Sequence, residues 1–263
     1  MSDLVQIEAA EGIATLWLNR PASRNAVSLA MWDALAAAFG EVNKDSALRC
    51  LILRGRPSED GRVAFSAGAD ISEFPEKRAS AEQARAYAGH MEPAVAALAE
   101  SPHPSIAMIQ GSCTGGGLEL ALHCDLRFAG EGARLGMPIQ RIGHGLPLTA
   151  MRALVQLVGR ATALELLLDA RLLDAQEAYV KGLVNRVFPT EKVIEETLAS
   201  ARRIAKGAPL AHRFHREATR RALQPKAYSQ KELNEPHKLC DTADYAEGVR
   251  AFLAKEEPQF RGE

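Results

Sequence analysis

The sequence predicts an α/β protein with a helical C-terminal region. Short apolar runs typical of β-strands alternate with segments of helical periodicity through the first two-thirds of the 263 residues. The last third is mainly helical in pattern. We therefore expect a core over residues 1–195 and a C-terminal helical region over residues 196–263. A single α/β domain of this length is common, and no internal repeat or low-complexity linker divides the chain.

Six segments have the composition of short strands: residues 3–9, 12–19, 50–55, 105–111, 125–130 and 183–187. Glu11 and Gly12 separate the first two, so these two are expected to form a hairpin. The segments CLILRG (50–55) and SIAMIQG (105–111) are almost wholly apolar, which is typical of buried strands. These runs supply the strands of the predicted core.

Helical patterns fill most of the remaining chain. Ser28 is a good N-cap for an apolar-periodic helix from Leu29 to about Asn43. A second helix is expected over residues 80–99, and a third over LELALHC (118–124). From about Leu146 onward helices dominate.

Composition and charge exclude several classes of protein. The 32 Lys and Arg residues balance 33 Asp and Glu residues, so neither nucleic acid nor a membrane surface is an expected partner. The cysteines lack the spacing of zinc sites or disulfide frameworks, and His212 and His215 lack further ligands, so no metal is expected. No apolar run is long enough to span a bilayer and no targeting segment is evident, which predicts a cytoplasmic protein.

Two glycine-containing loops are the strongest candidates for a functional site. FSAGADI (65–71) follows a buried strand, and QGSCTGGGLELA (110–121) reads as a strand, a glycine turn and a helix. Glycine lets the backbone approach a ligand closely, and a helix N-terminus presents unpaired N–H groups. One N–H group from each loop could converge on a carbonyl oxygen and form an oxyanion hole.

Simpler explanations exist for both features. A glycine run before a helix often serves only tight packing, and this one lacks the Lys-Ser/Thr ending of a phosphate-binding loop. Glu119 lies in the first turn of the helix, where glutamate is common because it complements the helix dipole. Spacing alone leaves both the packing and the catalytic interpretations open.

Four segments in order resemble landmarks of the crotonase (enoyl-CoA hydratase/isomerase) superfamily. They are NRPASRNAVS (19–28), FSAGADISEF (65–74), HPSIAMIQGSCTGGGLELALHCDLRFA (103–129) and AEGVRAFLAKEEPQF (246–260). The resemblance covers nearly the whole chain. It implies a crotonase-like spiral of ββα units with a C-terminal helical trimerisation region, a homotrimer or dimer of trimers, and an acyl group carried as a coenzyme A thioester with no bound cofactor.

The resemblance also implies roles for individual residues. Ala69 and Gly116 match the two oxyanion donors, and Glu119 matches a catalytic glutamate. Five further positions match residues that contact CoA, the last two from a neighbouring subunit: Arg24, Ala67, Asp70, Phe252 and Lys255. Such donors stabilise the charge that develops on a thioester oxygen, and a carboxylate beside the α and β carbons moves protons.

One position departs from the family pattern. Typical hydratases of the family have a second glutamate after a proline, and here that position is Ile139 in LGMPIQRIGHGLP (135–147). Glu119 would then have to perform both proton transfers of a hydration. His144, five residues further on, is a candidate for the missing group, although a packing or surface role is the simpler interpretation. Arg141 is a candidate for binding a second carboxylate on a substrate.

The expected function is therefore hydration of an enoyl-CoA through an enolate stabilised by an oxyanion hole. Double-bond isomerisation or decarboxylation with a single glutamate is the first alternative. A catalytically weak relative that binds acyl-CoA or RNA is the second.

Overall fold

The computed structural model describes residues 3–263. Its strands are β1 (Val5–Ala10), β2 (Ile13–Leu18), β3 (Cys50–Gly55), β4 (Ser105–Ile109), β5 (Ser112–Thr114), β6 (Leu126–Gly130), β7 (Arg134–Gly136), β8 (Leu173–Asp174) and β9 (Arg186–Phe188). Its α-helices are α1 (Leu29–Val42), α2 (Phe74–Lys77), α3 (Ala81–Ala99), α4 (Gly116–His123), α5 (Leu148–Leu168), α6 (Ala175–Val180), α7 (Val193–Ala205), α8 (Pro209–Ala222), α9 (Gln230–Lys238) and α10 (Ala243–Ala254). Short 3-10 helices cover Pro21–Ser23, Ile71–Glu73, Pro138–Ile142 and Leu239–Asp241.

The strands form two mixed sheets. The larger has the order β1-β2-β3-β4-β6-β9, in which only the β1–β2 pair is antiparallel. The smaller has the order β5-β7-β8, with β5 and β7 parallel. The predicted hairpin is therefore confirmed, since Val5 pairs with Leu18 and Ala10 with Ile13.

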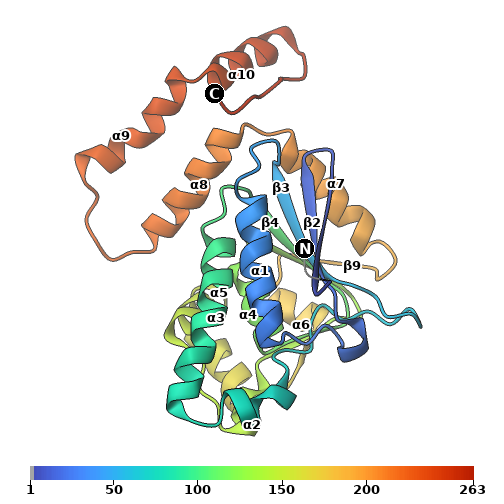
Figure 1. Cartoon of the computed structure of the whole chain (residues 1–263). Helices are drawn as coiled ribbons and strands as arrows, with labels where there is room; N and C mark the ends of the chain where they lie inside the picture. Colours follow the sequence, from blue (N-terminus) through green and yellow to red (C-terminus); the bar gives the residue numbers. More distant parts are fainter. Residues whose placement is uncertain (1–2) are drawn as a thin grey trace.

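Both faces of the larger sheet are covered, as parallel strands require. Successive side chains of β3 point to opposite faces: Leu51 and Leu53 pack in the main core with α1 and α3, whereas Cys50 and Ile52 pack in a second cluster with Val193 and Ala201 of α7. Figure 1 shows α1 and α7 on opposite sides of the strands. The position at residue 195, where we divided the chain, thus falls within a helix that packs on the sheet.

The predicted helix after Ser28 is also confirmed. The Ser28 hydroxyl accepts a hydrogen bond from the backbone N–H of Met31, which satisfies one of the free donors of the first turn. Three differences from the expected boundaries concern the shortest elements. Part of the glycine turn is β5, α4 begins at Gly116 rather than at Leu118, and the last strand lies at residues 186–188 rather than 183–187.

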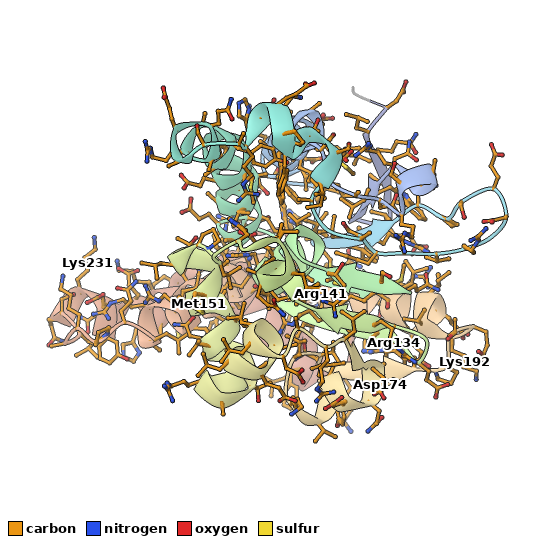
Figure 2. The ribbon with its side chains drawn as sticks, turned by 90° about the horizontal axis from the view of Figure 1, so that it is seen from below. Arg134, Arg141, Met151, Asp174, Lys192 and Lys231 are labelled. Atoms are coloured by element: carbon orange, nitrogen blue, oxygen red, sulfur yellow. The ribbon has the colours of Figure 1, made fainter. Side chains whose placement is uncertain are left out.

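The C-terminal helices extend away from the sheets. In Figure 1, α9 and α10 lie at the opposite end of the molecule from α2. We call helices α8 to α10 the C-terminal arm, and Figure 2 shows Lys231 of α9 far out on this arm. Helix α8 is fixed to the body by Arg216, whose Nε donates to Asp125 at 2.7 Å. Because α8 and α9 bury none of their residues, little intramolecular packing supports this arm.

Asn25 joins three segments near the loops at residues 65–71. Its fully buried amide donates to Arg56 O and Ala64 O, at 3.0 and 2.8 Å, and its Oδ1 accepts from the backbone N–H of Arg20 at 3.0 Å. The backbone oxygen of the preceding residue, Arg24, accepts a hydrogen bond from Ala67 N. Asn25 thereby helps to place the loop in which Ala67 and Ala69 lie.

Replacing Asn25 with alanine should destabilise the fold. The variant leaves the two carbonyls and one N–H without their partner, and unsatisfied buried groups cost about 1–3 kcal/mol each, so we expect a loss of about 3 kcal/mol. Urea unfolding at one fixed protein concentration measures it. Asn234→Ala, at an exposed position of α9, is the control and should change stability by less than about 0.5 kcal/mol. Equal midpoints for the two variants would contradict this role of Asn25.

Candidate active site

The two loops singled out in the sequence lie against each other through backbone hydrogen bonds. Ser66 N donates to Ser112 O at 2.9 Å, and Thr114 N donates to Ser66 O at 3.0 Å. The Thr114 hydroxyl also donates to Ala67 O at 2.9 Å. These bonds fix the distance between the segment that contains Ala69 and the N-terminus of α4.

Two N–H groups are left free where the loops meet. Within residues 3–263, the backbone N–H groups of Ala69 and Gly116 have no hydrogen-bond acceptor. A Cβ atom on Gly116 would lie 3.5 Å from Ala69 N and 3.3 Å from Trp32, so the two backbones approach closely and glycine keeps the space open. Gly68, at φ +104°, gives the first loop a turn that side-chain-bearing residues rarely adopt. The geometry matches an oxyanion hole.

A cavity of about 270 Å³ opens beside this pair. Its wall includes the backbone at Ala67, Ala69 and Gly116 together with Glu119. The remaining wall is largely apolar, with four polar or charged side chains, and comprises Gly68, Ile71, Phe74, Arg78, Met91, Thr114, Gly115, Met137, Pro138, Ile139, Arg141, Ile142, His144, Leu146 and Pro147. The structure therefore brings together the predicted residues Ala67, Ala69, Gly116, Glu119, Ile139, Arg141 and His144.

Among the described residues, Glu119 is the single carboxylate that lines the cavity. Only 7% of the residue is exposed, and its carboxyl group has no hydrogen-bond partner among the described residues. Burial raises the pKa of Glu119 to about 7, because the charged form loses water, while the nearby Arg78 cation opposes this rise. A carboxyl group with such a pKa can both accept and return a proton near neutral pH. Ile139 lies on the same wall, so no second carboxylate faces the cavity from that position.

His144 is bound to Arg78, an arginine that sequence reasoning missed. The two atoms Arg78 Nη2 and His144 Nε2 are 2.7 Å apart. Since arginine can only donate, His144 Nε2 must be the acceptor and the ring must be neutral with its proton on Nδ1. Burial and the Arg78 charge both lower the pKa of His144, in agreement with this. His144 therefore does not present a free Nε2 as a substitute for the second glutamate.

Arg141 is engaged elsewhere. Its Nη2 donates to Ala170 O at 3.0 Å, and Figure 2 shows it on the body of the molecule. Nothing in the sequence pattern marked Arg78, which follows the four-residue helix α2 and precedes the Ser80 cap of α3. Its position on the wall depends on the packing of α2 against α3.

The residues expected to contact CoA are distributed over four places, the last of which is α10. Ala67 lies at the mouth of the candidate oxyanion hole. Arg24 lines a separate cavity of about 710 Å³ that also contains Arg56, Arg62 and Arg134. Asp70 does not line the 270 Å³ cavity: its carboxylate accepts from Arg20 at 2.8 Å and from Ser72, so its observed contacts hold the loop in place.

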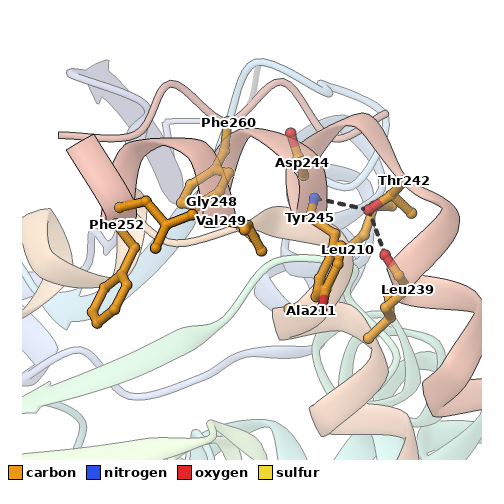
Figure 3. Close-up of a pocket in the computed structure, with 12 residues that line it drawn as sticks. Leu210, Ala211, Leu239, Thr242, Asp244, Tyr245, Gly248, Val249, Phe252 and Phe260 are labelled. Carbon is orange, nitrogen blue, oxygen red and sulfur yellow. Dashed lines mark hydrogen bonds between the residues drawn. The ribbon is translucent and has the colours of Figure 1, made fainter. Parts of the chain in front are cut away.

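Phe252 and Lys255 lie far from this site within one chain. Phe252, 83% exposed on α10, borders a groove of about 480 Å³ between α8 and α10, which Figure 3 shows with Leu210, Tyr245 and Val249. Lys255 caps the C-terminus of α10. Among residues 3–263 no group of His, Cys, Asp or Glu side chains is arranged to hold a metal ion, and no helix is long and apolar enough to cross a membrane.

The fold and the site define an α/β protein in which two free backbone N–H groups share a cavity with a single buried glutamate. Comparison with known proteins gives the family. The family model described as enoyl-CoA hydratase/isomerase matches residues 8–263. The chain is 33% identical over 267 residues to the 2,3-dehydroadipyl-CoA hydratase of Escherichia coli, covering 100% of both chains. It is 32% identical over 256 residues to the crotonyl-CoA hydratase of Syntrophomonas wolfei, covering 97% of this chain and 96% of the relative.

Solved structures agree with this result. The crystal structure of an enoyl-CoA hydratase/carnithine racemase from Magnetospirillum magneticum superimposes with a TM-score of 0.96 at 43% identity, covering 100% of this chain and 97% of the other. The chain therefore belongs to the crotonase (enoyl-CoA hydratase/isomerase) superfamily. The expected crotonase fold, with two mixed sheets and C-terminal helices, is confirmed. CoA thioesters are the substrates with which this family works.

The raised pKa of Glu119 should appear in the pH dependence of turnover. If the ionised carboxylate is the base, kcat/KM should rise with pH, with its midpoint at about pH 7, and level off about one pH unit higher. In Arg78→Met the cation that lowers the Glu119 pKa is gone, so the rise should move to higher pH. His144 and Arg141 line the same cavity, and His123 is hydrogen-bonded to the backbone oxygen of Glu119. Comparing the pH profiles of the wild type and the variant isolates the effect of Arg78, because these other groups are present in both. A profile that moves to lower pH in Arg78→Met would contradict the assignment.

Proposed function

We propose that this protein hydrates the 2,3 double bond of a 2-enoyl-CoA thioester. The observation that carries the proposal is the buried Glu119 carboxyl group, which shares one cavity with the free N–H groups of Ala69 and Gly116. The names of the relatives, a 2,3-dehydroadipyl-CoA hydratase and a crotonyl-CoA hydratase, support the same reaction type.

The thioester oxygen would accept hydrogen bonds from Ala69 N and Gly116 N. As water attacks the β-carbon, Glu119 takes one water proton, the carbon–oxygen bond forms, and the double-bond electrons move to the thioester oxygen as an enolate. Glu119 then gives the proton to the α-carbon, so that the product differs from the substrate by one water. Because the two N–H groups act on charge that exists only during the reaction, losing one costs about 10²–10³ in rate.

Ile139 favours isomerisation as the second candidate. Moving a double bond between the 3,4 and 2,3 positions requires one group that takes a proton from the α-carbon and returns it to the γ-carbon, or the reverse. A single carboxylate suffices for that. The aliphatic side chain at residue 139 leaves Glu119 as that group.

The anionic parts of CoA would bind beside the first loop. Arg24, one of the four arginines of the 710 Å³ cavity, is joined to this loop because Ala67 N donates to Arg24 O at 2.9 Å. Phosphate groups favour arginine-rich sites of this kind. We also propose that Phe252 and Lys255 reach the nucleotide end of CoA bound to a neighbouring subunit.

An absorbance assay with a short 2-enoyl-CoA tests the reaction directly. Hydration removes the absorbance of the conjugated thioester and gives a product heavier by one water, whereas isomerisation of a 3-enoyl-CoA increases that absorbance. Glu119→Gln should lower kcat by about 10²–10⁴, and Gly116→Ala, whose methyl group would crowd Ala69 N, should lower kcat while leaving the fold intact. Full activity of Glu119→Gln would refute the catalytic assignment.

We propose a homotrimer, alone or paired as a dimer of trimers, formed through the C-terminal helices. The support is the apolar surface left uncovered on this arm, where Leu223, Tyr228 and Leu233 are each more than half exposed and Leu253 is 76% exposed. Sedimentation should give three or six times the 28.4 kDa chain mass. Leu253→Asp together with Phe252→Asp should shift the distribution toward monomer, and a wild-type monomer at micromolar concentration would rule out this assembly.

A further inference from the structure

Arg78 is a half-buried cation on the wall of the acyl cavity. Its guanidinium lies 4.9 Å from the ring centre of Phe74 and 5.1 Å from that of Tyr87. The hydrogen bond to His144 fixes it from a third direction. These contacts, from α2, α3 and the loop before α5, hold the group in one orientation beside the space that an acyl chain would fill.

Arg78 forms no ion pair with any carboxylate in residues 3–263. Three other arginines pair with carboxylates: Arg20 with Asp70, Arg216 with Asp125 and Arg221 with Glu232. The more deeply buried Arg54 and Arg127 pair with no carboxylate, and donate instead to Gln110 and to backbone carbonyls, respectively. Of the Arg78 side-chain donors, only Nη2 has an acceptor, and that acceptor is a neutral imidazole. An unpaired charge taken from water is costly, and burial lowers the pKa of Arg78 accordingly.

Glu119 does not satisfy this cation. The two groups influence each other electrostatically, but no hydrogen bond or ion pair joins them. Because the pKa of Glu119 is about 7, a large share of its carboxyl groups carries no charge near neutral pH. Arg78 lines a cavity whose other walls are mostly apolar, and its Nε and Nη1 have no acceptor within residues 3–263. This arrangement is suited to a carboxylate on a ligand.

We propose that Arg78, oriented by His144, binds a carboxylate at the far end of the acyl group, so that the substrates are CoA thioesters of dicarboxylic acids. This inference rests on the proposed function only in placing an acyl-CoA in the cavity. His144 acts as a positioning residue: it accepts from one Nη2–H, and the second Nη2–H, together with either Nε–H or Nη1–H, is left for two parallel hydrogen bonds to one carboxylate. The apolar walls at Phe74 and Ile142 would enclose the methylene carbons between the carboxylate and the thioester.

Binding of two unreactive thioesters tests the proposal without requiring turnover. Adipyl-CoA and hexanoyl-CoA have six-carbon acyl chains that differ only in a terminal carboxylate or methyl group, and neither has a double bond to hydrate. Calorimetry on the wild-type protein should show adipyl-CoA binding at least about tenfold more tightly, as expected for a charge-assisted hydrogen-bonded pair. Equal affinities, or tighter binding of hexanoyl-CoA, would overturn the proposal without any variant.

Variants then assign the preference to Arg78. Arg78→Met should abolish or reverse it, whereas hexanoyl-CoA should bind within a few-fold of wild type, which also reports an intact site. Arg85→Met is the matched control: it removes one positive charge from the exposed side of α3, outside the cavity, and should keep the preference. A preference that survives in Arg78→Met, or that disappears equally in Arg85→Met, contradicts the assignment.

Turnover separates this inference from the proposed function. Hydration of 2,3-dehydroadipyl-CoA should exceed that of 2-hexenoyl-CoA in kcat/KM, mainly through KM, and Arg78→Met should remove the difference. If neither compound is hydrated but adipyl-CoA still binds preferentially through Arg78, the proposed reaction fails and the carboxylate site stands. If 2-hexenoyl-CoA is hydrated but adipyl-CoA and hexanoyl-CoA bind equally well, the proposed reaction stands and the carboxylate site is ruled out.

Discussion

The pairing of two loop backbones is the constraint on which the site depends. The backbone of Ser66 donates one hydrogen bond to Ser112 and accepts one from Thr114, and a Cβ atom on Gly117 would collide with Ser66 at 2.5 Å. The small residues of the two loops are therefore required for contact between segments about 50 positions apart in the chain. Only this contact places one free N–H group from each loop on the same side of the cavity, and a small shift of either loop would separate them.

The same close packing determines the chemistry of Glu119. Helix α4 begins immediately after the paired loops, so its first turn is buried and its glutamate is removed from water. Desolvation alone raises the carboxyl pKa toward neutrality, and Arg78 limits that rise from the other wall. The site thus obtains one group that can serve as both base and acid, at the cost in stability of burying an ionisable side chain with no hydrogen-bond partner.

The sequence predicted the parts of the structure that depend on local patterns. The hairpin at Glu11-Gly12, the Ser28 cap and the buried strand at residues 50–55 followed from turn residues and periodicity, and the resemblance to a family gave the positions of Glu119, Ala69 and Gly116. The strands β5, β7 and β8 have only two or three residues and hence no measurable period. Arg78 lies in an irregular segment, so only tertiary packing shows that it reaches His144 and that Asp70 is bound to Arg20.

The charges of Arg78 and Glu119 give a physical reason for isoleucine at residue 139. A glutamate there would face the same cavity as Arg78 and could pair with it, which would use the donors that are free in this structure. It would also repel an acyl carboxylate and raise the pKa of Glu119 further, since two like charges in a poorly hydrated space disfavour each other's ionisation. A site that binds an anionic acyl group is therefore better served by one carboxylate than by two. On the carboxylate proposal, the isoleucine at residue 139 and the unpaired Arg78 serve the same purpose, with Glu119 left to carry both proton transfers.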